Sequence, residues 1–168
     1  SIVTFILLCG PFLTYFPILL GDRFNAKAYE IGIILSFASV STAITSSQLD
    51  KISQVLKHTN LLLTAYFLYS LAMLTAAFVP GTWYLLLSAA LFGIAQGMNL
   101  PALLNMLASS APLKVRGAFM SVNGWVLRIG QTLGPVLAGI IYAEYSLNAT
   151  FYFGIGIAVV MLLIVITM

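Results

Sequence analysis

Charge is what this 168-residue sequence has least of. Only 11 side chains are charged at neutral pH, seven Lys or Arg and four Asp or Glu, which is 7% of the chain. A soluble domain carries about a quarter charged residues, because its surface faces water. Since 61% of the residues are hydrophobic, we expect lipid to be the solvent, and the net charge of +3 does not indicate nucleic-acid binding.

Cysteine is scarce as well. The single cysteine, Cys9, lies within an apolar run, which excludes a disulfide framework and offers no metal-ligand spacing. We expect neither a metal nor a cofactor. The first apolar run lacks a basic leader and a small-residue cleavage site, so a signal peptide is not expected. Because both ends lie inside apolar stretches, we expect the sequence to be an excerpt of a longer protein.

Long polar connections are also missing, and apolar stretches fill the chain. Crossing the hydrocarbon takes about 20 mostly apolar residues, and an open backbone in lipid must be helical. Six stretches meet this length, at roughly 2–20, 30–47, 60–79, 83–109, 118–143 and 150–168. The sequence therefore predicts an all-α integral membrane fold with six transmembrane helices and no soluble domain.

The few basic residues between the spans predict the orientation of the chain. Cytoplasmic connections of membrane proteins carry an excess of Lys and Arg. The second and fourth connections hold four such residues and the other three hold two, namely Lys51, Lys57, Lys114 and Arg116 against Arg23 and Lys27. We therefore expect the second and fourth connections, and both chain ends, to lie in the cytoplasm.

Prolines in the first and fourth spans indicate a repeat of three helices. Pro11 and Pro17 lie in the first span, and Pro101 lies in the fourth. Interrupted helices at corresponding positions of two three-helix units mark the central site of many transporters. Prolines are also more frequent in membrane helices generally, so the pattern alone leaves both interpretations open.

Residues 92–139 resemble the tenth and eleventh helices of major facilitator superfamily transporters. The matching elements are Gly93, Gly97, Pro101, Pro112, Arg116, Gly117, Gly130, Gly134, Pro135 and Gly139. Residues 49–58 are similar to the short basic connection of that family, with Ser47 and Ser53 where glycines are usual, and residues 12–36 are similar to its seventh helix. The resemblance covers the whole chain as the carboxy-terminal half of a twelve-helix protein, and the Gly-Pro pattern favours the bacterial efflux branch.

This resemblance implies one 3+3 inverted-repeat half of an alternating-access carrier. In the family, the first and fourth helices of each half line the cavity, the second and fifth flank it, and the third and sixth face lipid. The implied function is proton-coupled efflux of small organic molecules or drugs across the bacterial inner membrane, with uptake of a metabolite or sugar as the alternative. The implied partners are the bilayer, the missing amino-terminal half, a small-molecule substrate and protons.

Arg128 is the strongest candidate for the substrate pathway. A charge at the centre of a membrane helix costs about 2.5–3.5 kcal/mol, so such residues usually face a cavity or a partner. Arg128 lies about ten residues from Gly117, or some 15 Å, which is close to the bilayer midplane. All four acidic residues lie at span ends. Its counter-charge could be a carboxylate in the missing half, an anionic substrate, or helix carbonyls and water.

Other polar and small residues complete the candidate set. Gln131 shares the face of Arg128, while Gln96 and Asn99 share a face of the fourth span and serve either as substrate contacts or as bridges between helices. Tyr15 is equally a cavity hydroxyl or a packing residue, and Pro101 marks the pathway helix. Close helix packing is predicted at Gly93, Gly97, Gly130, Gly134 and Pro135. The resemblance implies a cytoplasmic gate at Asp50, Lys51 and Arg116, whose alternative role is orientation alone.

Two other classes of function compete with transport. An intramembrane protease needs a buried nucleophile with a base in reach. The only histidine, His58, lies in a basic connection, and the sequence contains no GxSxG motif, so we do not expect an enzyme. A non-transporting membrane scaffold is the remaining alternative, and it predicts that loss of Arg128 has no effect on transport.

Overall fold

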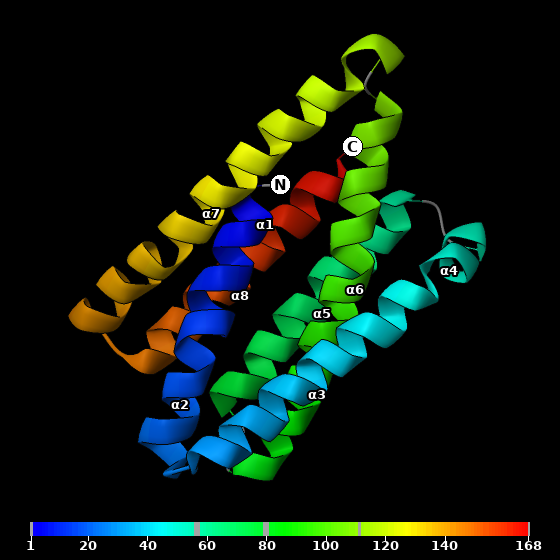
Figure 1. The fold of residues 1–168 in the computed structure, drawn as a ribbon. Helices are drawn as coiled ribbons and strands as arrows, with labels where there is room; N and C mark the ends of the chain where they lie inside the picture. Colours follow the sequence, from blue (N-terminus) through cyan, green and yellow to red (C-terminus); the bar gives the residue numbers. More distant parts are fainter. Residues whose placement is uncertain (1, 56–57, 79–80, 111, 168) are drawn as a thin grey trace.

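A computed structural model describes residues 2–55, 58–78, 81–110 and 112–167, and within these ranges the chain is almost wholly helical, with no strand (Figure 1). Five helices are long and apolar enough to cross a membrane. They are α3 (Ala28–Ser47), α5 (His58–Phe78), α6 (Leu85–Ser110), α7 (Arg116–Glu144) and α8 (Leu147–Ile166). Each coincides with one of the predicted spans. The predicted positions 79 and 168, and Lys57 in the second connection, lie outside the described residues.

The remaining predicted span, the first, is helical but not one regular α-helix. It consists of α1 (Ile2–Leu7), a π-helical segment η1 (Leu8–Thr14) and α2 (Tyr15–Phe24). Pro11 lies in η1 and has no N–H to continue an α-helical ladder. The Thr14 hydroxyl donates to the Cys9 carbonyl at 2.7 Å, five residues back. The first span is therefore interrupted near its centre, as its prolines indicate.

Short elements complete the connections. A short helix α4 (Leu49–Val55) follows α3, and the 3₁₀ turns η2 (Thr82–Tyr84) and η3 (Leu113–Val115) precede α6 and α7. The start of α1 and the end of α8 lie at the end of the bundle that carries α4 and η3 (Figure 1). We call this the basic end, because Lys51, Lys114 and Arg116 lie there. At the opposite end, the Arg23 guanidinium donates to the Ala77 carbonyl in the last turn of α5 at 2.9 Å.

The helix pairing has the symmetry of two three-helix units. The second span, α3, packs along α6, and the first span packs in the same way along the fifth, α7. The third span, α5, packs on α6, and the sixth, α8, packs on the first span. The third and sixth spans also pack on each other. Exchanging the two units therefore reproduces the same contacts, which supports the predicted 3+3 repeat.

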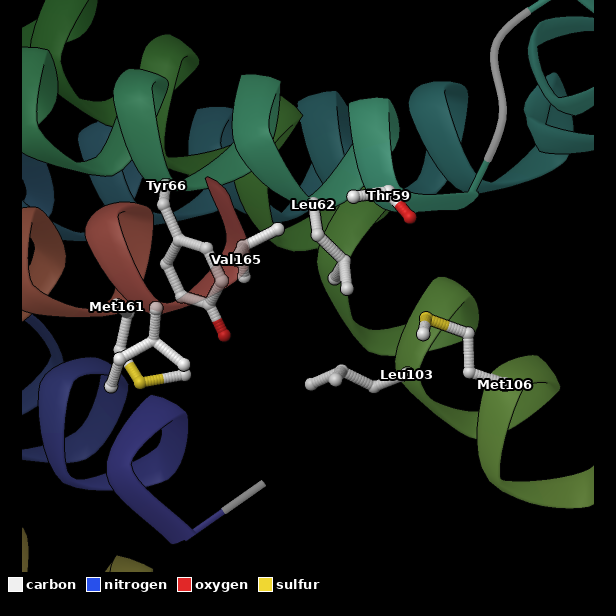
Figure 2. Close-up of a pocket in the computed structure, with 8 residues that line it drawn as sticks. Thr59, Leu62, Tyr66, Leu103, Met106, Met161 and Val165 are labelled. Carbon is white, nitrogen blue, oxygen red and sulfur yellow. The ribbon is translucent and has the colours of Figure 1, made fainter. Parts of the chain in front are cut away.

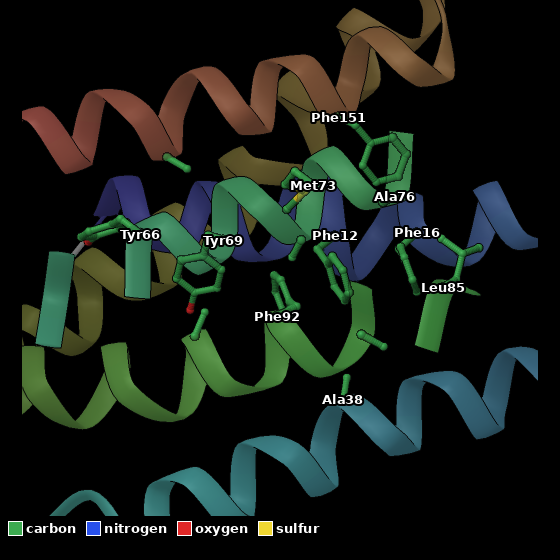
Figure 3. Close-up of a cluster of buried hydrophobic side chains, with 14 of the residues drawn as sticks. Phe12, Phe16, Ala38, Tyr66, Tyr69, Met73, Ala76, Leu85, Phe92 and Phe151 are labelled. Carbon is green, nitrogen blue, oxygen red and sulfur yellow. The ribbon is translucent and has the colours of Figure 1, made fainter. Parts of the chain in front are cut away.

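The core lies where the first span, α5 and α6 meet (Figure 3). The rings of Phe12 and Phe92 are stacked with centroids 3.5 Å apart, and Tyr69 meets Phe92 edge-on at 5.3 Å. Ser88 donates to the Ala72 carbonyl at 2.7 Å and so joins α6 to α5. In lipid, such packing and interhelical hydrogen bonds hold helices together in place of the hydrophobic effect.

The two flanking helices are the least covered. Only 17% of the apolar window of α3, and likewise of α7, is buried, compared with 56% in α5 and in α6. They lie on opposite sides of the bundle (Figure 1). The third span also presents an apolar stripe outward, at Phe67, Leu71, Leu74 and Phe78. The bundle thus has a lipid-compatible surface on α5 and two open flanks on α3 and α7.

Candidate functional site

Glycine brings α7 and the first span into backbone contact. A Cβ on Gly10 would lie 2.6 Å from the Gly134 carbonyl oxygen, and a Cβ on Gly134 would lie 2.9 Å from the Gly10 nitrogen. Neither position therefore has room for a side chain. Gly130 and Ala138, one turn to either side of Gly134, are buried as well. The small-residue face of α7 is the face that packs on the first span.

The same arrangement recurs between α6 and α3. A Cβ on Gly93 would overlap the Ala38 carbonyl oxygen, and one on Gly97 would lie 2.7 Å from the Thr42 carbonyl oxygen. These contacts support the predicted packing roles of both glycines. Pro135, also predicted to pack, is half-buried within an unbroken α7. Gly10 was not among the predicted packing residues, although its place beside Pro11 in an apolar span is a usable signal.

Arg128 lies on the opposite, exposed face of α7. There it lines a surface cavity of about 490 Å³ together with Ser121, Gly124 and Trp125. These four residues are spaced i, i+3, i+4 and i+7, which is the hole that accepts a side chain from a facing helix in knobs-into-holes packing. Gly124 leaves the hole open, since a Cβ there would meet nothing within 4 Å. Within the described residues the Arg128 guanidinium has no hydrogen-bond or ion-pair partner.

A second hole with the same spacing lies six residues closer to the basic end. It measures about 340 Å³ and is formed by Val115, Ala118, Phe119 and Val122, all apolar. At about 100° per residue the two holes point roughly 120° apart around α7. We call the exposed surface that carries both of them the α7 outer face. Sequence reasoning found Arg128 but missed this surface and Trp125, which is 76% exposed. The i, i+3, i+4, i+7 spacing, which occurs twice between Val115 and Arg128, is the signal in the sequence that points to this surface.

The other predicted pathway residues do not gather at Arg128. Asn99 is fully buried, close to Tyr66 of α5. This location favours the bridging alternative over a surface contact. Gln96 and Gln131 are half-buried on different helices. Tyr15 is buried and packs on Tyr142 of α7 with ring centroids 5.4 Å apart, which favours its packing alternative.

Pro101 does not interrupt the fourth span, and interruption is one of the two interpretations that the sequence leaves open. It is half-buried, and α6 runs unbroken from Leu85 to Ser110. Proline removes the hydrogen bond to the carbonyl four residues earlier, here that of Gly97. The Ser46 hydroxyl of α3 donates to this carbonyl at 3.2 Å. A neighbouring helix thus supplies the donor that Pro101 lacks, so of the first and fourth spans only the first departs from a regular α-helix.

The predicted gate residues all belong to the basic end. Lys51 is exposed on α4, and Arg116 is exposed at the first residue of α7. The Asp50 side chain lies outside what the structure describes. In Figure 1, α4 and the start of α7 lie at the same end of the bundle but on different sides of it. The two basic residues are therefore placed at one membrane surface without forming a single cluster.

Comparison with known proteins decides the family. All of residues 1–168 match the family model of the Major Facilitator Superfamily. The chain is a member of this family. It is therefore a multi-pass membrane protein of the transporter class, and its long apolar helices agree with this membership.

The sequence is also similar to individual members of the family whose names are known. The Multidrug resistance protein MdtG of Citrobacter koseri is 28% identical over 148 residues, which cover 88% of this chain and 36% of the relative. The proteins of the same name from Salmonella schwarzengrund and Salmonella arizonae are each 27% identical over 148 residues, covering 88% of this chain and 37% of theirs. The chain thus spans little more than a third of the length of these relatives.

Proposed function

We propose that this chain is the carboxy-terminal six-helix half of a twelve-helix secondary transporter that exports small organic molecules by alternating access. The name Multidrug resistance protein carried by its relatives supports efflux rather than the uptake of a metabolite or sugar. The single observation that carries the proposal is the α7 outer face. It offers two side-chain holes, and a guanidinium without a partner among the described residues, to helices that lie outside this half.

In this proposal, the amino-terminal half packs on the α7 outer face. An apolar side chain of that half fills the hole at Val122, and a carboxylate of the same half, about two turns deeper, meets Arg128. Of the three counter-charges open from the sequence, the carboxylate fits best, because a knob seated between Gly124 and Trp125 brings an acidic group beside the guanidinium. A bare arginine at this depth costs several kcal/mol, which such a pair offsets in part.

The glycine contacts join helices into pairs that move together. Backbone contact at Gly10 and Gly134 joins α7 to the first span, and contact at Gly93 and Gly97 joins α6 to α3. Close-packed pairs of this kind move as rigid bodies, so the half rocks as a unit and the α7 outer face is the surface that slides or parts. In this proposal, Gln131 and Gln96 contribute polar groups to the substrate pathway.

The coupling ion and orientation follow the same logic. No carboxylate of the described spans lies at mid-depth, so we place the proton-binding acid in the other half. The basic end faces the cytoplasm of a bacterial inner membrane, by the excess of Lys and Arg there. Asp50, Lys51 and Arg116 would then act at the cytoplasmic gate. No catalytic role is proposed for any residue.

The test uses the full-length protein reconstituted in liposomes, with ethidium as the transported probe and an imposed pH gradient. We expect gradient-dependent ethidium movement, and we expect it to fail when residues 1–168 are reconstituted alone. Co-expression of the two halves as separate chains should restore part of the flux. Flux by the isolated half as a monomer, verified by crosslinking, would contradict the half-transporter assignment.

A further inference from the structure

A separate cavity lies inside this half, away from the α7 outer face. It measures about 280 Å³ and is the space between α5, α6 and α8 near the basic end (Figure 2). Its walls include Leu62 of α5, Leu103 and Met106 of α6, and Met161 of α8. No described residue of α7 lines it. Whatever binds there occupies a site distinct from the one that Arg128 serves.

The cavity has one polar end. The Tyr66 side chain is fully buried, and Figure 2 shows its hydroxyl directed into the space between Met161 and Leu103. This hydroxyl shares a hydrogen bond of 2.7 Å with Thr4 of α1. A phenolic hydroxyl both donates and accepts, so one bond to Thr4 leaves capacity for a second, for which Asn99 lies close enough to compete. Thr59 adds another hydroxyl at the mouth of the cavity.

Behind Tyr66 lies further unsatisfied polarity. Asn99 lies close to Tyr66, yet neither its amide nitrogen nor its amide oxygen has a hydrogen bond of good geometry with any described residue. The Tyr69 hydroxyl is in the same condition. Buried polar groups in proteins are nearly always hydrogen-bonded. Because Tyr66 has no exposed surface, an occupant reaches its hydroxyl only when the neighbouring side chains shift, and a hydrogen-bonding group has unsatisfied partners to meet there.

Size and charge restrict the occupant. A cavity of 280 Å³ falls just short of the range of about 300–1,000 Å³ typical of drug-sized ligands. No described lining residue carries a charge at neutral pH, so a charged ligand would be buried without a partner. Met106 and Met161 are flexible and polarizable, which suits apolar bodies of differing shape.

We propose that this cavity binds a small uncharged amphiphile, such as a medium-chain alcohol or a phenol. Its apolar body lies among Leu62, Leu103 and Met161, and its hydroxyl group hydrogen-bonds to Tyr66. The cavity is a second site within the half, and the proposal does not depend on what the whole protein transports.

The probe is 3-azioctanol, a photoreactive medium-chain alcohol, used on the full-length protein in lipid nanodiscs with the labelled residues located by mass spectrometry. We expect label on Leu62, Leu103, Met106 or Met161, and competition by octanol but not by octane. Tyr66→Phe should reduce this label about fivefold, the effect of losing one hydrogen bond. Leu103→Trp should fill the cavity and abolish the label, whereas Leu87→Trp, an exposed position on the same helix, should not.

Folding is checked by the melting temperature of each variant, and Thr59→Val serves as a second, milder change at the polar end. Label confined to outward positions such as Phe67 would overturn the proposal, because it would show simple partitioning into lipid. Equal competition by octane and octanol would also overturn it, since the cavity would then be a plain acyl-chain groove. Failure of Leu103→Trp to alter the label, with the fold intact, would place the binding elsewhere.

Discussion

The Ser46 hydroxyl donates to the carbonyl that Pro101 leaves free, that of Gly97, at 3.2 Å. The three residues lie on two helices, and the contact forms where Gly97 lets α3 approach α6. Proline, glycine and serine therefore act together. The glycine admits the second helix, the proline frees an acceptor, and the serine donates to it.

This relationship predicts a coupling between Ser46 and Pro101. Ser46→Ala should lower the free energy of unfolding by about 1 kcal/mol, the scale of an interhelical hydrogen bond in membrane proteins. Pro101→Ala supplies an N–H to the same carbonyl, so Ser46→Ala should have little effect in that background. SDS titration of the full-length protein in mixed micelles measures the free energy of unfolding of the wild type, both single variants and the double variant. Ser39→Ala is the matched control, because Ser39 donates within its own helix. Strictly additive effects would contradict the relationship.

The contact between Gly10 and Gly134 predicts severe overpacking. Gly134→Ala should destabilise the protein by about 1–3 kcal/mol, because the neighbouring atoms are backbone and cannot turn aside. Gly156→Ala is the control. Its Cβ would meet nothing within 4 Å, so the substitution should be neutral or slightly stabilising through helix propensity. Thermal unfolding of both variants in detergent gives the comparison, and equal melting temperatures would show that the two backbones can separate freely.

Much of the fold can be predicted from composition alone. Apolar length locates the six spans, because lipid requires about 20 residues to be crossed and leaves helices as the permitted form. The effect of each proline on its helix cannot be predicted in the same way. Pro11 and Pro101 give the same local signal, yet the first lies in a π-helical segment and the second in an unbroken helix. In the second case Ser46, 51 residues from its acceptor, supplies the missing donor.

The candidate site, like the fold, has some residues that can be predicted from the sequence and others that cannot. Arg128 stands out in the sequence because a charge in lipid is costly wherever it points. Asn99 does not stand out, because an amide occurs both in cavities and between packed helices. Only the fold shows that Asn99 is buried close to Tyr66. The pairing of Tyr66 with Thr4 joins residues 62 positions apart. No local pattern contains such contacts.

The α7 outer face predicts that filling its deeper hole will impair transport without unfolding the protein. Gly124→Leu places a side chain where a knob from the other half is expected, and its Cβ meets nothing within 4 Å in this half. We expect ethidium flux to fall at least about tenfold, since a displacement of about 1 Å between close-packed surfaces is enough to misplace a functional group. Val136→Leu, also exposed on α7 but outside both holes, should retain flux. Normal flux in Gly124→Leu would show that no helix packs there.

Arg128 should be the residue whose loss affects transport most, and through its charge. We expect Arg128→Ala to abolish ethidium flux in the full-length protein while expression persists, because removing the charge also removes its insertion cost. Arg128→Lys should be intermediate, since lysine keeps the charge but lacks the planar fork that holds a carboxylate at two points. If a buried carboxylate of the other half is its partner, Arg128→Ala should also lower the melting temperature, because that carboxylate is left unpaired. A second substitution that neutralises the carboxylate should then restore stability but not flux. Measuring flux and melting together on Arg128→Ala, Arg128→Lys and the Val136→Ala control separates the outcomes. Normal flux in Arg128→Ala would mean that the guanidinium is a tolerated charge on a lipid-facing or water-lined surface, and that the α7 outer face recognises its partner by shape alone.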